Sequence, residues 1–136
     1  MKVVVHVDGG ARGNPGPAAA AAVISTPAGE VLDEVFETLG TATNNVAEYR
    51  GVLLGLCRAR ELGASEVELV NDSELVAKQI KGVYRVKHPA MAPLHLDAMS
   101  ALRSFSRWSV RSVPRAENRA ADRLVNEALD AGARAR

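Results

Sequence analysis

The chain opens with Val3-Val4-Val5-His6-Val7-Asp8, a run of β-branched side chains that ends in a carboxylate and is followed by Gly9-Gly10. Such a run predicts a strand, because β-branched side chains pack well on a pleated sheet. The glycines and the segment Gly13-Asn14-Pro15-Gly16-Pro17 predict a loop. We therefore expect a first strand that presents Asp8 at its carboxyl end.

The remaining elements follow from turn signals and apolar spacing. Strands are predicted over 18–25, 31–39, 67–70 and 108–113, and helices over 44–62, 73–82, 93–105 and 117–131. The alanine run at 18–22 favours a strand only because it lies between two turn signals. Asn44 or Asn45 is expected to cap the first helix and Ser73 the second. Cys57 falls in the apolar pattern of the first helix, so we expect it to be buried.

The predicted order of elements is βββαβααβα, which indicates an α/β fold. Three consecutive strands favour an antiparallel meander, and strands separated by helices favour parallel, right-handed crossovers. We expect a mixed five-stranded sheet flanked by helices, forming one domain over 1–131. Residues 132–136 are expected to be a disordered tail or the start of a linker.

Composition excludes several classes of protein. Apolar residues make up 47% of the 136 residues and charged residues 24%, which is typical of a globular domain. No apolar run is long enough for a transmembrane helix, and the N-terminus lacks the pattern of a signal peptide. We expect a cytoplasmic protein that does not bind membranes. A single cysteine excludes an internal disulfide framework.

Charge is distributed unevenly along the chain. Residues 1–77 hold 5 basic and 11 acidic side chains, and residues 78–136 hold 12 basic and 5 acidic ones. Such segregation indicates either a basic surface for a polyanion beside an acidic site, or two solvated faces that differ in charge.

Two of the acidic residues are expected to meet. Asp8 ends the first predicted strand and Asp72 follows the fourth, so parallel pairing of these strands would place them side by side. Adjacent carboxylates repel, and both stay ionised only with a cation between them. Oxygen ligands suit Mg²⁺ or Mn²⁺. Taken singly, these residues could instead form turns, and Glu48 and Asp122 could simply complement helix dipoles.

Four motifs in this order give the chain a resemblance to ribonuclease HI, and to its short actinobacterial form in particular. The resemblance covers residues 1 to about 131. The motifs are Val7-Asp8-Gly9-Gly10 with Gly13-Asn14-Pro15-Gly16-Pro17, Thr43-Asn44-Asn45-Val46-Ala47-Glu48-Tyr49, Asn71-Asp72-Ser73-Glu74-Leu75-Val76, and Val113-Pro114-Arg115 with Asn118 and Ala121-Asp122.

The resemblance implies a catalytic site and a reaction. Asp8, Glu48, Asp72 and Asp122 match the family's four catalytic carboxylates, which hold two Mg²⁺ ions, with Mn²⁺ as a substitute. One ion activates water and the other stabilises the leaving 3′ oxygen, so that the RNA strand of an RNA–DNA hybrid is cut to 5′-phosphate and 3′-hydroxyl ends.

The resemblance also implies residues that bind the hybrid. Asn14, Asn44 and Asn45 match minor-groove contacts, and Thr43 matches a position that grips a phosphate of the DNA strand. Amide side chains both donate and accept, so they can contact 2′-hydroxyls and base edges. Alternatively, Asn14 only shapes a turn, and Asn44 or Asn45 only caps a helix. A shortened basic handle over 81–88 retains three cationic side chains: Lys81, Arg85 and Lys87.

The chain departs from the better-known bacterial members in one loop. No histidine lies between Pro114 and Asp122, and Arg115 occupies the nearest matching region. We expect Arg115 to assist catalysis by holding a phosphate, because a guanidinium stays protonated and is a poor base. We expect a monomer. Two other functions remain open: a non-catalytic hybrid-binding module of a larger fusion, and a DNA-cutting nuclease of the same superfamily.

Overall fold

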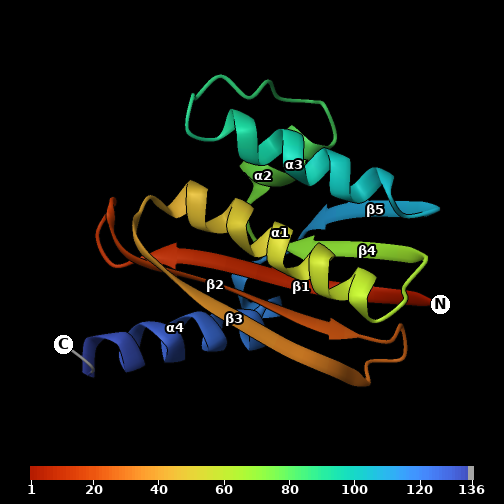
Figure 1. The fold of residues 1–136 in the computed structure, drawn as a ribbon, viewed down its shortest axis with the longest axis horizontal. Coiled ribbons are helices and arrows are strands. Elements are labelled where there is room, and N and C mark those ends of the chain that lie inside the picture. Colours follow the sequence, from red (N-terminus) through yellow and green to blue (C-terminus); the bar gives the residue numbers. More distant parts are fainter. Residues whose placement is uncertain (135–136) are drawn as a thin grey trace.

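The computed structural model describes residues 1–134, which form one mixed five-stranded sheet with helices on both faces (Figure 1). The strands are β1 (Lys2–Ala11), β2 (Gly16–Ser25), β3 (Val31–Ala42), β4 (Glu66–Asn71) and β5 (Arg107–Ser112). They lie in the order β3-β2-β1-β4-β5, with β1, β2 and β3 antiparallel and with β4 and β5 parallel to β1. The predicted fold class and element order are confirmed.

Helices cover the two faces unequally. The helices are α1 (Asn44–Glu61), α2 (Glu74–Ile80), α3 (Ala92–Arg103) and α4 (Arg119–Arg134), and a 3₁₀ turn spans Arg115–Glu117. In Figure 1, α1 crosses in front of the sheet with α2 and α3 above it, and α4 runs along the far side. None of the helices formed by residues 1–134 has the length and hydropathy that a membrane crossing requires.

The alanine run lies in β2, whose side chains contribute to a hydrophobic core on each face of the sheet. Ala22 and Ile24 belong to the larger core beneath α1 and α3. Ala19, Ala21 and Val23 belong to a smaller core beneath α4. Because successive strand residues point to opposite faces, these small side chains let a helix approach on each side.

The first strand is longer than predicted. It continues past Asp8 to Ala11, because β2 pairs with it as far as Ala11 with Ala18. The parallel pairing with β4 ends earlier, at His6 with Val70. Asp8 therefore lies just beyond the parallel part of the sheet, as does Asp72.

Details of the helices also differ from the prediction. Thr43 caps α1, its hydroxyl accepting a hydrogen bond from the Val46 N–H, so neither neighbouring asparagine is the cap. Cys57 is exposed, because it lies outside the face of α1 that packs on the sheet. The last helix begins at Arg119, after the 3₁₀ turn, and continues past residue 131 to Arg134. Residues 135–136 of the expected tail lie outside the described residues.

Candidate active site

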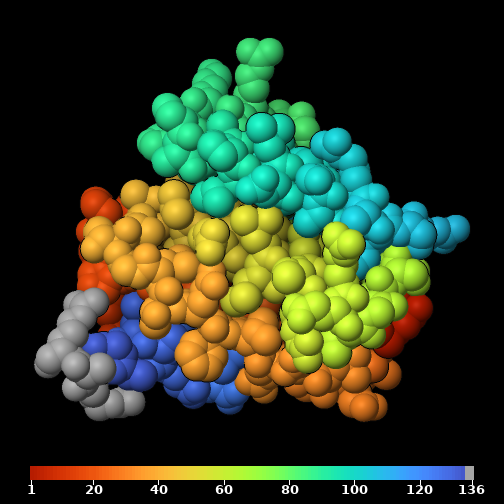
Figure 2. Space-filling view, viewed as in Figure 1, coloured from red at the N-terminus to blue at the C-terminus, as the bar shows by residue number. Residues whose placement is uncertain are grey.

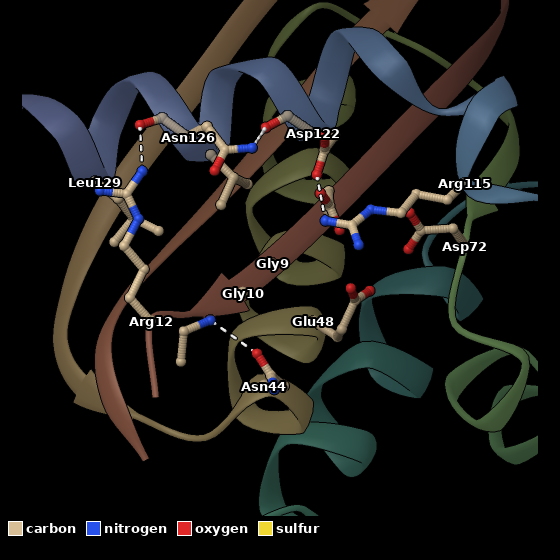
Figure 3. Close-up of a pocket in the computed structure, with 13 residues that line it drawn as sticks. Gly9, Gly10, Arg12, Asn44, Glu48, Asp72, Arg115, Asp122, Asn126 and Leu129 are labelled. Atoms are coloured by element: carbon tan, nitrogen blue, oxygen red, sulfur yellow. Dashed lines mark hydrogen bonds and ion pairs between the residues drawn. The ribbon is translucent and has the colours of Figure 1, made fainter. Parts of the chain in front are cut away.

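Three of the four predicted carboxylates meet near the carboxyl ends of the neighbouring strands β1 and β4. Asp8 on β1, Glu48 on α1 and Asp72 after β4 each offer an oxygen, and these oxygens lie within 4.8 Å of one another. The parallel pairing of β1 and β4 brings the two aspartates together, as the sequence predicted. All three line a cavity of about 450 Å³ that is shown in Figure 3.

Close packing of α1 on β1 brings the third carboxylate, Glu48, into this group. A Cβ added to Gly9 would lie 2.0 Å from the carbonyl oxygen of Ala47, and one added to Gly51 would lie 2.6 Å from that of Asp8. Any side chain at either position would therefore hold the helix away from the strand. The two glycines let the backbones touch, which places Glu48 next to Asp8.

Crowding of these groups changes their titration. Burial, followed by the charges of Asp72 and Asp122, raises the pKa of Asp8 to about 7, although a hydrogen bond with Glu48 lowers it. Burial and the neighbouring Asp8 raise the pKa of Glu48 well above its usual range. Burial also raises the pKa of Asp72, although Arg115 and Asn118 lower it. Without a cation, both Asp8 and Glu48 therefore bind protons more readily than a free carboxylate does.

The fourth carboxylate lies on the opposite wall. Asp122, in the first turn of α4, lines the same cavity but is not one of the three residues whose oxygens lie within 4.8 Å of one another. Its Oδ1 accepts a hydrogen bond from Arg115 Nη2 at 3.3 Å. Figure 3 shows the guanidinium of Arg115 between Asp122 and Asp72, and the Arg115 side chain is 78% exposed.

Asn118 fixes the start of α4 against the sheet. It is buried, and its side-chain amide donates to the carbonyl oxygen of Val7 at 2.9 Å. Its backbone carbonyl oxygen accepts from the Asp122 N–H, and its side chain lowers the pKa of the nearby Asp72 carboxyl. The position of Asp122 relative to Asp8 and Asp72 therefore depends on this residue. The sequence signal was its spacing, four residues before Asp122.

The donor set fits a hard divalent cation. The three grouped side chains offer only carboxylate oxygens, which are the ligands that Mg²⁺ and Mn²⁺ favour. Glu48 Oε2 is buried and has no hydrogen-bond partner among the described residues. A buried carboxylate oxygen without a donor is costly, and a cation would satisfy it.

Two of the three predicted hybrid-binding asparagines, Asn14 and Asn44, join the β1–β2 hairpin to α1. Asn14 Oδ1 accepts from the Asn44 N–H at 3.1 Å, and Asn44 Oδ1 accepts from the Ala11 N–H at 2.8 Å. Asn44 lines the cavity, whereas Asn14, Asn45 and Thr43 lie outside its lining. Asn14 and Asn44 remain exposed, so their amide groups are also accessible to a ligand.

The predicted basic handle lies away from the carboxylates. Lys81, Arg85 and Lys87 are exposed, and none of them lines the cavity. The segment 82–90 has neither helix nor strand and forms the upper edge of the molecule in Figure 2. Sequence reasoning missed part of the cavity lining, namely Arg12 and the α4 residues Val125, Asn126 and Leu129.

Comparison with known proteins places this chain in a family. A sequence model of the reverse transcriptase-like family matches residues 6–128. The structure of the N-terminal RNase H domain of a Mycobacterium tuberculosis protein, obtained as a fusion with maltose binding protein, is 48% identical. It matches with a TM-score of 0.96 over 99% of this chain and 98% of that one.

Two further structures are similar. RNase H1 of Halobacterium salinarum is 42% identical, with a TM-score of 0.93 over 96% of this chain and 98% of that one. LC11-RNase H1, solved in complex with an RNA/DNA hybrid, is 37% identical, with a TM-score of 0.91 over 96% of this chain and 98% of that one.

The full-length relatives are longer than this chain. The bifunctional protein of Mycobacterium tuberculosis is 49% identical over 134 residues, which are 98% of this chain but 37% of that protein. The Halobacterium salinarum ribonuclease HI is 42% identical over 95% of this chain and 65% of its own length. Since the family match spans most of the sequence and the fold agrees throughout, the chain belongs to the reverse transcriptase-like family, and its resemblance to ribonuclease HI is confirmed.

Proposed function

We propose that this protein is a metal-dependent endoribonuclease that cuts the RNA strand of RNA–DNA hybrids. The proposal rests mainly on one observation: Asp8, Glu48 and Asp72 lie close together near the carboxyl ends of β1 and β4, and Asp122 lines the same cavity. A binding module alone would gain nothing from a cluster of mutually repelling carboxylates. The similarity to an RNase H1 that was solved with a hybrid supports the choice of substrate.

The four carboxylates would hold the catalytic ions. Asp8 and Glu48 lie deepest, and Asp72 and Asp122 are only partly buried, so the latter two face an incoming phosphate. Two bound Mg²⁺ ions, or Mn²⁺ in their place, would supply an activated water and stabilise the leaving 3′ oxygen, giving 5′-phosphate and 3′-hydroxyl ends. The chain's own contribution is to fix the carboxylates and to hold their negative charge together.

Neutral and basic side chains would position the hybrid. Asn14, Asn44 and Asn45 would contact the minor groove, where amides can recognise the 2′-hydroxyls that distinguish RNA from DNA. Thr43 would grip a phosphate of the DNA strand with the hydroxyl proton that its capping bond leaves free. The exposed handle residues Lys81, Arg85 and Lys87 would add phosphate contacts whose strength falls with salt.

Arg115 would act at the scissile phosphate without transferring a proton. Its exposed guanidinium bonds to Asp122, and its positive charge favours the ionised form of Asp72. The same fork of N–H groups can hold a phosphate oxygen. We further propose that the protein acts as a monomer in the cytoplasm.

The test is a gel assay with three matched duplexes: RNA–DNA hybrid, duplex RNA and duplex DNA. We expect cleavage of the hybrid alone, only with Mg²⁺ or Mn²⁺, and none after chelation. Terminal labelling identifies the product ends. Hybrid binding without cleavage would favour the non-catalytic module, and cleavage of duplex DNA would favour a different nuclease of the superfamily.

A further inference from the structure

Arg12 is a cationic residue in the cavity lining for which the proposed reaction has no role. It follows the end of β1 and reaches across to α4, as Figure 3 shows. Its Nη2 lies 2.6 Å from Asp130 Oδ1 and 3.5 Å from the carbonyl oxygen of Asn126. Both contacts use one nitrogen, so Nε and Nη1 donate to no group among the residues described.

The contact with Asp130 does little for the stability of the fold. The side chains of Arg12 and Asp130 are 44% and 52% exposed. Ion pairs this exposed contribute about 0–1 kcal/mol, because water screens them and ordering two long side chains costs entropy. Stability alone therefore gives a weak reason for an arginine at this position.

Arg12 shares its cavity with the carboxylates and with Arg115. It lines the same cavity as Asp8 and Glu48, at the end away from Arg115. Each of the two arginines is paired with an aspartate of α4, Arg12 with Asp130 and Arg115 with Asp122. The cavity therefore has a guanidinium at each end and carboxylates between them.

The segment that carries Arg12 is held in place by its neighbours. Before it, the Ala11 N–H donates to the Asn44 side chain, and after it, the Asn14 side chain accepts from the Asn44 backbone. The segment that carries Arg12 is thus bonded to Asn44, a proposed hybrid-binding residue, on both sides of Arg12. A polyanion that contacts both Asn14 and the carboxylates passes close to its guanidinium.

We propose that Arg12 binds a backbone phosphate of the nucleic acid, with Asp130 as the counter-ion that the phosphate replaces. A planar guanidinium donates two parallel hydrogen bonds to phosphate oxygens, and Arg12 has donors available for this. The inference rests on the proposed function, because it requires a hybrid lying in the cavity. It adds a substrate-binding residue that neither the motifs nor the resemblance assigned.

The test is steady-state kinetics on an RNA–DNA hybrid at several salt concentrations. For Arg12→Gln we expect KM to rise about fivefold, with kcat within about twofold of wild type, because a charged hydrogen bond to the substrate is lost. The salt dependence of log KM should weaken by about 0.9 for the one phosphate contact removed. Arg12→Lys keeps the positive charge but loses the pair of parallel hydrogen bonds that a guanidinium donates, so its KM should lie between those of the wild type and Arg12→Gln.

Two further variants make the result specific. Arg123→Gln is the matched control, since Arg123 is an exposed arginine of α4 that pairs with Glu34 and Glu127 outside the cavity. It should leave KM and its salt dependence unchanged. Asp130→Asn removes the competing carboxylate, so we expect KM equal to or below that of wild type.

The outcomes distinguish failure of the Arg12 proposal from failure of the proposed nuclease function. An unchanged KM in Arg12→Gln, with cleavage intact, overturns the role of Arg12 and leaves the nuclease standing. An equal rise of KM in Arg12→Gln and Asp130→Asn overturns it too, since the pair would then be a structural link between hairpin and helix. A wild-type chain that neither binds nor cuts the hybrid overturns both proposals. Should Arg12→Gln melt far below wild type, the results for Arg12→Lys and Asp130→Asn decide.

Discussion

Replacing Asp8 with asparagine should abolish cleavage and, in the absence of metal, stabilise the folded protein. The pKa of Asp8 is raised from its ordinary 3.8 to about 7, mainly by burial. The native state therefore keeps a proton that the unfolded chain has already released between about pH 4 and pH 7. Because the native state binds more protons in that window, its stability falls as pH rises through it.

The size of the effect follows from the two pKa values. For a single carboxyl with these two pKa values, integrating the difference in bound protons from pH 5 to pH 8 gives a loss of about 2–3 kcal/mol. Asp8→Asn carries no charge at this position, so it should lack this loss. At about pH 8 without metal, the variant should therefore be more stable than the wild type by a similar amount.

The assay is urea unfolding at several pH values, with chelator and then with Mg²⁺. Asp97→Asn, which removes an exposed carboxylate of α3, is the matched control and should follow the wild type. Mg²⁺ should stabilise the wild type more than Asp8→Asn. If Asp8→Asn shows the same pH dependence as the wild type, or is less stable at pH 8 without metal, the crowding argument is refuted.

Substitutions at Gly9, Asn118 and Arg115 test the residues around the carboxylates, with Gly10→Ala as the control for Gly9→Ala. Gly9→Ala would place a methyl group 2.0 Å from the Ala47 carbonyl oxygen, so we expect a loss of several kcal/mol and of activity in unfolding and cleavage assays. Gly10→Ala, with its nearest atom at 3.8 Å, should cost under about 1 kcal/mol, and equal losses would contradict the close-packing argument. Asn118→Ala removes a buried hydrogen bond and should cost about 1–3 kcal/mol, measured by urea unfolding; a cost near zero would mean that it does not anchor α4. Arg115→Ala should lower kcat on the hybrid about tenfold or more while changing KM less, and an unchanged kcat would remove it from the proposed mechanism.

The sheet could be predicted from the sequence because its signals are local. The β-branched run of β1 and the spacing of crossover helices determine which strands pair and in which direction. That parallel pairing of β1 and β4 is sufficient to bring Asp8 and Asp72 together. The sequence predicted that β1 would end at Asp8, because Gly9 and Gly10 follow it. In the structure β1 continues through these glycines, because β2 pairs with it as far as Ala11.

Contacts between distant segments could not be predicted in this way. Thr43, Asn44 and Asn45 are all good capping residues, and contacts with the hairpin single out Thr43 because they occupy the Asn44 side chain. The proximity of Glu48 to Asp8 depends on backbone contact at Gly9, which no spacing rule indicates. The pairing of Arg12 with Asp130 joins residues 118 positions apart.

Anomalous diffraction from crystals grown with Mn²⁺ tests most directly whether the grouped carboxylates hold the catalytic metal. We expect a peak bonded to Asp8, Glu48 and Asp72, at roughly the 2.0–2.3 Å typical of such oxygen ligands. Crystals of Asp8→Asn grown in the same way should lack it. Wild-type crystals without such a peak, at a Mn²⁺ concentration that supports full hybrid cleavage in solution, would show that these carboxylates do not hold the catalytic metal.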